Sequence, residues 1–219
     1  MLMPRHSRFA VYLSGLLGCL SAGVFLASLS SLVARACYSP ETALGQVCRG
    51  QVPDSIPEPV LANLGALAYQ AIAHVMERNH ERPQPLNETQ KQYLRPYFGD
   101  LVDRVRIVYD AKLMDNWVGA NLRLDLGYSN AQVYGYRIYV NESYRPDDLE
   151  QVILLAHELI HVRQSEQLGG LGEFGYQYFL AYKRADRVYE NNLFEKEAFA
   201  FEKRFEQWLQ HNQQHRKMR

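Results

Sequence analysis

The stretch VILLAHELIHVR, residues 152–163, decides the fold and the chemistry expected of this chain. As a helix it would carry apolar side chains all round its circumference, which predicts a buried central helix. The same stretch nevertheless contains His157, Glu158 and His161. Burying two imidazoles and a carboxylate without partners would cost several kcal/mol. The pattern therefore predicts that something binds these three side chains.

The spacing of the three residues indicates what that partner is. His157 and His161 are four residues apart, so they lie on one helix face within reach of the same ion. Glu158 is rotated from His157 by about 100°, which suits it to take a proton from a metal-bound water. This HExxH pattern predicts one zinc ion, two histidine ligands and Glu158 as the catalytic base. The alternative is two core histidines bonded to oxygen atoms.

A catalytic zinc site usually has three protein ligands and an open fourth position. Residues 162–174 contain no histidine, so a third histidine soon after the motif is excluded. The remaining candidates are glutamates in or just before a later helical segment: Glu190, Glu195, Glu197 and Glu202.

Three segments resemble the gluzincins, the zinc metallopeptidases with a glutamate ligand: AQVYGYRIYV, LLAHELIHVRQ and NNLFEKEAF. More closely, together with the LVDRVRIVY strand, they are similar to a family of bacterial metallopeptidase domains of unsettled function, over roughly residues 85–210. The resemblance implies that Glu195 is the third zinc ligand, with Glu197 as the alternative. Such families often place an aspartate four residues later to orient a histidine. That position is Phe199 here, and Asn191, Asn192 or Glu202 could take over this task.

Two strands are predicted, at residues 103–110 and 131–142. In the second, alternation would place Tyr134, Tyr136, Ile138 and Val140 on one face. In zincins an edge strand above the active-site helix pairs with an extended peptide. The resemblance therefore implies that Tyr136 and Ile138 bind substrate, and an interior strand without ligand contact is the alternative.

The other segments are mostly helical. Helices are predicted at residues 61–81, from Asn87 or Thr89 to Gly99, from Asp147 to Gly169, and at residues 173–190 and 193–214. Residues 111–130 are expected to form an irregular excursion or a short helix around Trp117. These elements predict an α+β fold. The resemblance implies that it is zincin-like, with an edge strand over a buried active-site helix and a helical C-terminal half.

Residues 9–33 contain no charged side chain and follow Arg5 and Arg8. About 20 apolar residues suffice to cross a bilayer, so three readings compete: a transmembrane anchor, a signal peptide cleaved after Ala36, and a lipoprotein signal ending at Cys19. All three predict export, on the far side of a bacterial inner membrane or into the periplasm. In that oxidising compartment Cys37 and Cys48 could form a disulfide, the alternative being two free thiols.

The chain is accordingly divided into five parts. These are a signal peptide or anchor (1–36), a proline-rich linker (37–60), a helical lead-in (61–84), a zincin-like metallopeptidase domain (85–213) and a polar tail (214–219). The formal net charge is zero, which argues against a nucleic-acid partner.

The function expected is an exported zinc metallopeptidase that hydrolyses a peptide or amide bond in a peptide or protein substrate. Its N-terminal segment would associate it with the membrane. Two alternatives remain. One is a non-catalytic binding or assembly module of the cell envelope, stabilised by the metal. The other is an envelope factor whose partner is another membrane protein.

Overall fold

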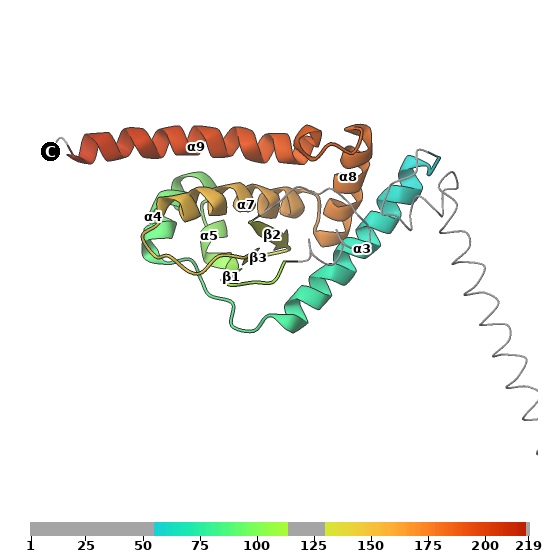
Figure 1. The fold of residues 1–219 in the computed structure, drawn as a ribbon, viewed down its shortest axis with the longest axis horizontal. Coiled ribbons are helices and arrows are strands. Elements are labelled where there is room, and N and C mark those ends of the chain that lie inside the picture. Colours follow the sequence, from blue (N-terminus) through green and yellow to red (C-terminus); the bar gives the residue numbers. More distant parts are fainter. Residues whose placement is uncertain (1–54, 114–129, 218–219) are drawn as a thin grey trace, which may run out of the picture. The chain divides into compact units, whose positions relative to one another are not determined.

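The computed structural model describes residues 55–113 and 130–217, with side chains to residue 212. These residues belong to one compact unit, Asp54–Arg219. The apolar segment at residues 9–33, the Cys37–Cys48 pair, most of the linker and the excursion around Trp117 lie outside the described residues. Six α-helices, one short 3-10 helix and three strands are described, so the α+β class is confirmed (Figure 1).

The helices largely follow the predicted order. They are α3 (Glu58–Asn79), α4 (Glu88–Phe98), α5 (Leu101–Arg104), α7 (Leu149–Gln167), α8 (Leu171–Arg184), the 3-10 helix η2 (Tyr189–Asn191) and α9 (Leu193–Lys217). Asn87 caps the start of α4, as predicted: its side chain accepts the Gln90 backbone N–H, and the Gln90 side chain accepts the Asn87 backbone N–H. Gly99 ends the helix, also as predicted. The helix α9 continues through residues predicted to form a polar tail.

The sheet corrects the prediction of a single strand at residues 131–142. That segment is a hairpin of β2 (Ala131–Tyr134) and β3 (Arg137–Val140), which pair antiparallel. Gly135 has a φ of +62°, a conformation that suits glycine and allows a two-residue reversal. The residues predicted to share one face are therefore split between two strands, on either side of the turn.

The strand order places the sheet edge from this segment in β2, which corrects the prediction that Tyr136 and Ile138 form the edge that binds substrate. The order is β1-β3-β2, where β1 (Arg106–Val108) is parallel to β3. Ile138 is fully buried on the central strand, where β1 and β2 already occupy both sides of the backbone. It therefore cannot add a substrate strand. Tyr136 lies in the turn, and its hydroxyl donates to Glu166.

The core lies between the sheet, α7 and α9. In Figure 1 α7 runs between α9 and the strands, and α7 is buried on nearly all sides from Gln151 to Ser165. Its neighbours in the core come from the sheet and from α9: Ile107, Val133, Ile138, Val140, Ala198, Phe201, Phe205 and Leu209. The prediction of a buried central helix is thus confirmed.

Residues next to α7 determine where the helix begins and ends. Asp148 caps its start by accepting the backbone N–H groups of Glu150 and Gln151, one residue later than the predicted cap. Gly169 and Gly170 follow its end with positive φ values, as predicted. A single long helix with both histidines near its middle results.

The chain between α8 and α9 differs from the prediction of one helix at residues 173–190. The helix ends at Arg184, and Asp186 and Arg187 adopt positive φ values before η2 begins. Asn192 is buried and accepts the backbone N–H of Phe194 at the start of α9. This double turn brings the first turn of α9 beside α7.

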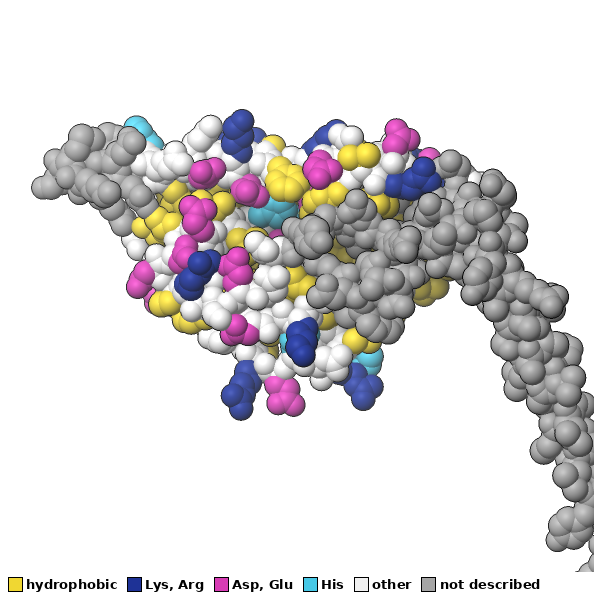
Figure 2. Space-filling view, viewed as in Figure 1, with side chains coloured by type: hydrophobic (Ala, Val, Ile, Leu, Met, Phe, Trp, Pro, Cys, Tyr) yellow, Lys and Arg dark blue, Asp and Glu magenta, His cyan; other side chains and the backbone are white. Residues whose placement is uncertain are grey.

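Figure 2 shows that acidic and basic side chains intermingle over the described part of the face in view. That distribution agrees with the formal net charge of zero.

Candidate metal centre

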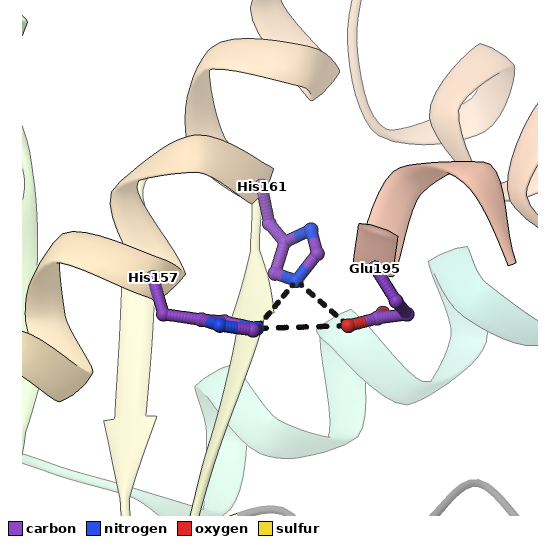
Figure 3. Close-up of side chains that lie close together, drawn as sticks. All are labelled: His157, His161 and Glu195. Atoms are coloured by element: carbon purple, nitrogen blue, oxygen red, sulfur yellow. Dashed lines mark hydrogen bonds and ion pairs between the residues drawn. The ribbon is translucent and has the colours of Figure 1, made fainter. Parts of the chain in front are cut away.

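Three side chains from two helices meet in the core. His157 and His161 extend from successive turns of α7, and Glu195 extends from the first turn of α9 (Figure 3). The two Nε2 atoms are 3.2 Å apart, and Glu195 Oε2 lies 3.6 Å from His157 Nε2 and 3.3 Å from His161 Nε2. All three side chains are buried. The structure therefore brings together the three residues that the sequence predicts as metal ligands.

These separations fit a single ion. A tetrahedral ion with bonds of about 2.0–2.1 Å holds its ligand atoms roughly 3.3 Å apart. The three separations of 3.2, 3.3 and 3.6 Å lie close to that value. His157, His161 and Glu195 could thus hold one metal ion and leave a fourth position for water or substrate.

Glu202 orients the first histidine. Its Oε2 lies 2.7 Å from His157 Nδ1. A carboxylate only accepts hydrogen bonds, so the proton of a neutral imidazole sits on Nδ1 and its lone pair on Nε2. Glu202 was one of three residues predicted to replace the aspartate missing at Phe199. The Phe199 ring itself packs edge-on against His157, with 4.8 Å between the ring centroids.

Gln164 orients the second histidine. Its Nε2 donates to the Phe194 carbonyl and to Glu197 Oε2, at 3.1 and 2.9 Å, so its Oε1 is left to accept from His161 Nδ1 at 2.8 Å. Nε2 of His161 then faces the centre with a lone pair. This network also gives the position of Glu197, the alternative ligand, which pairs with Gln164 rather than with the histidines.

The sequence reasoning missed Gln164. It is a buried amide one helical turn after His161, and that spacing was the available signal.

Tyr178 orients the carboxylate ligand. Its hydroxyl donates to Glu195 Oε1 at 2.7 Å. The other oxygen, Oε2, is buried and has no hydrogen-bond partner among the described residues. A buried carboxylate oxygen facing two imidazole lone pairs is costly unless a cation lies between them. The donor set therefore fits a metal ion.

The electrostatics of the three side chains are strongly coupled. Burial would lower the pKa of His157, but the nearby carboxylates of Glu195 and Glu202 outweigh it and raise that pKa to about 10. Burial likewise opposes a charge on His161, yet the Glu195 carboxylate raises its pKa. The pKa of Glu195 falls despite burial, because of the charge on His161 and the close approach of both imidazoles. Without a metal, these shifts favour a proton on the histidines, where it balances the charge of the Glu195 carboxylate.

Glu158 lies beside this cluster on α7 and is buried. Burial raises its pKa, although positive charge on His157 and His161 opposes the rise. A carboxyl group with a raised pKa next to a metal site is suited to exchange protons near neutral pH.

Aromatic side chains enclose the centre. Phe174 and Tyr178 from α8 pack together, with ring centroids 5.7 Å apart, and Tyr69 from α3 lies 5.5 Å from Phe174. The Tyr69 hydroxyl donates to the backbone carbonyl of Val133 on β2. Burial, together with nearby negative charges that include Glu195, raises the pKa values of Tyr69 and Tyr178. The part played by Tyr69 depends on a contact between distant segments, and no sequence signal pointed to it.

Part of the chain matches a known protein family. Residues 85–169 match the family model of the eCIS core domain, which denotes the core of extracellular contractile injection systems. The match is less than half of the chain. It includes α4, the three strands and α7 with His157, Glu158 and His161, and it ends before Glu195. No curated protein and no solved structure matches the chain.

Proposed function

We propose that this domain is a zinc-dependent hydrolase that cleaves a peptide or amide bond. The observation that carries the proposal is the buried, unpartnered Oε2 of Glu195, which faces the Nε2 atoms of His157 and His161 at tetrahedral spacing. Two imidazole nitrogens, one carboxylate oxygen and an open position form a donor set typical of catalytic zinc. The HExxH pattern within the segment that matches the eCIS core domain supports the same proposal.

Bound zinc would lower the pKa of a coordinated water and polarise the carbonyl of the scissile bond. The protein side chains transfer the proton and exclude bulk water. Glu158 accepts the proton of the attacking water on its carboxylate and then donates it to the leaving nitrogen. Its raised pKa suits both steps, because a base that binds the proton too weakly cannot deliver it. The aromatic side chains of Tyr69, Phe174 and Tyr178 help to exclude bulk water.

The test compares Glu158→Gln with His157→Ala. Glu158→Gln should retain the wild-type zinc content and lose at least about 100-fold in hydrolysis of a broad peptide library. His157→Ala should lose both zinc and hydrolysis. Metal is measured by elemental analysis, and a chelated wild-type sample is the control for contaminating peptidases. Full hydrolysis by Glu158→Gln would refute the mechanism.

A second function is favoured by a different observation. The three ligands join α7 to the first turn of α9, so a metal would also connect two parts of the core. We therefore keep a non-catalytic, metal-stabilised binding or assembly module as the alternative. A domain that binds zinc with 1:1 stoichiometry but cleaves nothing in the library, at any concentration tested, would favour this alternative.

Export to the cell envelope remains a proposal that rests on residues 9–33 and the basic residues before them. Within the described residues one helix, Glu58–Asn79, is long and apolar enough to cross a membrane by length and composition alone.

A further inference from the structure

The helix α3 has two separate rows of apolar residues. One side is buried and includes Leu61, Gly65 and Met76. At about 100° per residue, a second row of apolar residues lies away from the buried one: Val60, Leu64, Leu67, Ala71 and Val75. The exposed polar residues Asn63, Gln70 and His74 lie along one edge of this row. A helix in a soluble domain normally has only one such side, because the other faces water. The second apolar row of α3 therefore indicates a surface that another molecule contacts.

The first side is firmly occupied by α8. A Cβ atom added to Gly65 would lie 2.2 Å from Phe179 Cγ, and one added to Gly175 would lie 3.1 Å from the Ala66 Cα. These distances mean that the two helix backbones approach closely at their glycines. The Tyr69 hydroxyl adds a hydrogen bond from α3 to the sheet. Because α3 is bound along this side, it cannot cross a bilayer as an isolated helix without leaving the domain.

The second side is open to solvent. The exposed fractions of Val60, Leu64, Leu67 and Val75 are 49, 54, 65 and 40%. No Asp, Glu, Lys or Arg occurs from residue 59 to residue 76. Arg78 follows on the same side of the helix, and Arg82 lies just beyond its end. Neither arginine forms an ion pair with a described residue.

We propose that this side of α3 lies on the surface of a lipid bilayer, with the helix axis along the membrane plane and Arg78 and Arg82 among the lipid headgroups. An uncharged apolar row with polar residues along one edge and cations at its end is the pattern of an interfacial helix, which contacts acyl chains on one side and anionic headgroups at its edge.

The chain before α3 supports a bilayer as the occupant. Residues 9–33 are predicted to insert in a membrane, and only residues 34–57 separate them from α3. A segment of that length spans at most about 80–85 Å. If the N-terminal segment is retained, the domain stays near the membrane, and a modest affinity of α3 for lipid is then sufficient for contact. This proposal does not depend on metal binding or hydrolysis.

The test uses the full chain in vesicles of phosphatidylethanolamine and phosphatidylglycerol. The photoreactive residue p-benzoylphenylalanine replaces Leu67 in one variant and Gln207, an exposed residue of α9, in the control. We expect lipid adducts at position 67, detected by mass spectrometry, and at least tenfold fewer at position 207. A third variant with the photoreactive residue at Leu64 should behave like the first.

Two results would overturn the proposal. Equal yields of lipid adduct at positions 67 and 207 would mean that α3 does not lie against the bilayer. Adducts between two copies of the chain at position 67, without lipid adducts, would mean that a second copy covers α3. Thermal unfolding of each variant, compared with the unmodified chain, establishes that the domain is folded.

Discussion

The hydrogen bond from Tyr178 to Glu195 illustrates how one side chain can set the donor strength of a metal ligand. Tyr178 occupies Oε1 and leaves Oε2 for the centre. Tyr178→Phe removes this donor but keeps the ring between Phe174 and Phe194. We expect the dissociation constant for zinc to rise about 10-fold or more, the usual effect of losing an outer partner. A competition titration against a chromophoric chelator measures it.

The matched control is Tyr176→Phe, which removes a hydroxyl from the same helix, where no hydrogen bond of that hydroxyl is described. Its zinc affinity should equal that of the wild type. If both variants bind zinc as tightly as the wild type, Tyr178 has no role in holding Glu195.

Protons should compete with the metal at His157. Its pKa is raised to about 10 in the metal-free domain, so at pH 7 the imidazole is a cation with a second proton on Nε2, and zinc must displace that proton. We expect zinc binding at pH 7 to release at least about one proton, and the apparent affinity to increase with pH. Calorimetry in buffers with different ionisation enthalpies measures the number of protons released. A release of zero at pH 7 would contradict this prediction.

The same shift predicts the sign of a stability change in the metal-free domain. A histidine with a raised pKa in the folded state stabilises that state fully at pH values below its ordinary pKa of 6.5. This contribution disappears as the pH rises toward about 10. The metal-free domain should therefore be less stable to denaturant at pH 9.5 than at pH 6.

At the scale of the helix and strand, the pair α3 and α8 depends on close backbone contact. An added Cβ at Gly65 would lie 2.2–2.6 Å from atoms of the Phe179 side chain, too close to be accommodated without movement. We expect Gly65→Ala to destabilise the domain by about 1–3 kcal/mol, although alanine is otherwise the better helix former. Urea unfolding at equilibrium measures this change.

Gly172→Ala is the matched control, since its added Cβ would meet only the end of the flexible Gln70 side chain, at 3.0 Å. It should leave stability unchanged or slightly increased. The double variant Gly65→Ala with Phe179→Gly should recover part of the loss, because both the clashing ring and the Cβ atom at 2.6 Å are gone. Gly65→Ala with wild-type stability would show that α3 and α8 can separate at little cost.

The elements that the sequence predicted are those with local signals. Asn87, Gly99 and the glycine pair after α7 act through nearby backbone groups, so they could be recognised from neighbouring residues. The hairpin was missed because alternation continued across Gly135. The end of α8 was missed because Asp186 and Arg187 adopt positive φ values, which their residue types do not predict.

The residues of the site also divide into those with a local sequence signal and those without one. His157, Glu158 and His161 follow from helical spacing, while Glu195 came from a resemblance. Gln164 was within reach of the same reasoning, since it follows His161 by one turn of α7, but Tyr69 depends on how distant segments pack. A sequence pattern of one helix cannot contain that information.

For the whole molecule, the centre joins segments far apart in the chain, because α7 and α9 are separated by α8 and a double turn. A metal that binds only the folded state stabilises it by RT ln(1 + [L]/Kd), which is about 4 kcal/mol when free zinc is a thousand times Kd. For a domain of this size we expect zinc to raise Tm by roughly 10 °C relative to a chelated sample. Calorimetric melts with zinc and with chelator measure the shift.

Glu195→Gln separates this effect from general consequences of chelation. The variant keeps the shape of the side chain but removes the charge that opposes the cation, so zinc should bind far more weakly and the shift in Tm should shrink to a few degrees or less. Its metal-free form should fold, because a neutral amide next to two imidazoles replaces a buried carboxylate that lacks one partner. An equal shift in Tm for the wild type and Glu195→Gln would exclude Glu195 as a ligand. The α7–α9 contact would then owe its stability to the apolar core alone.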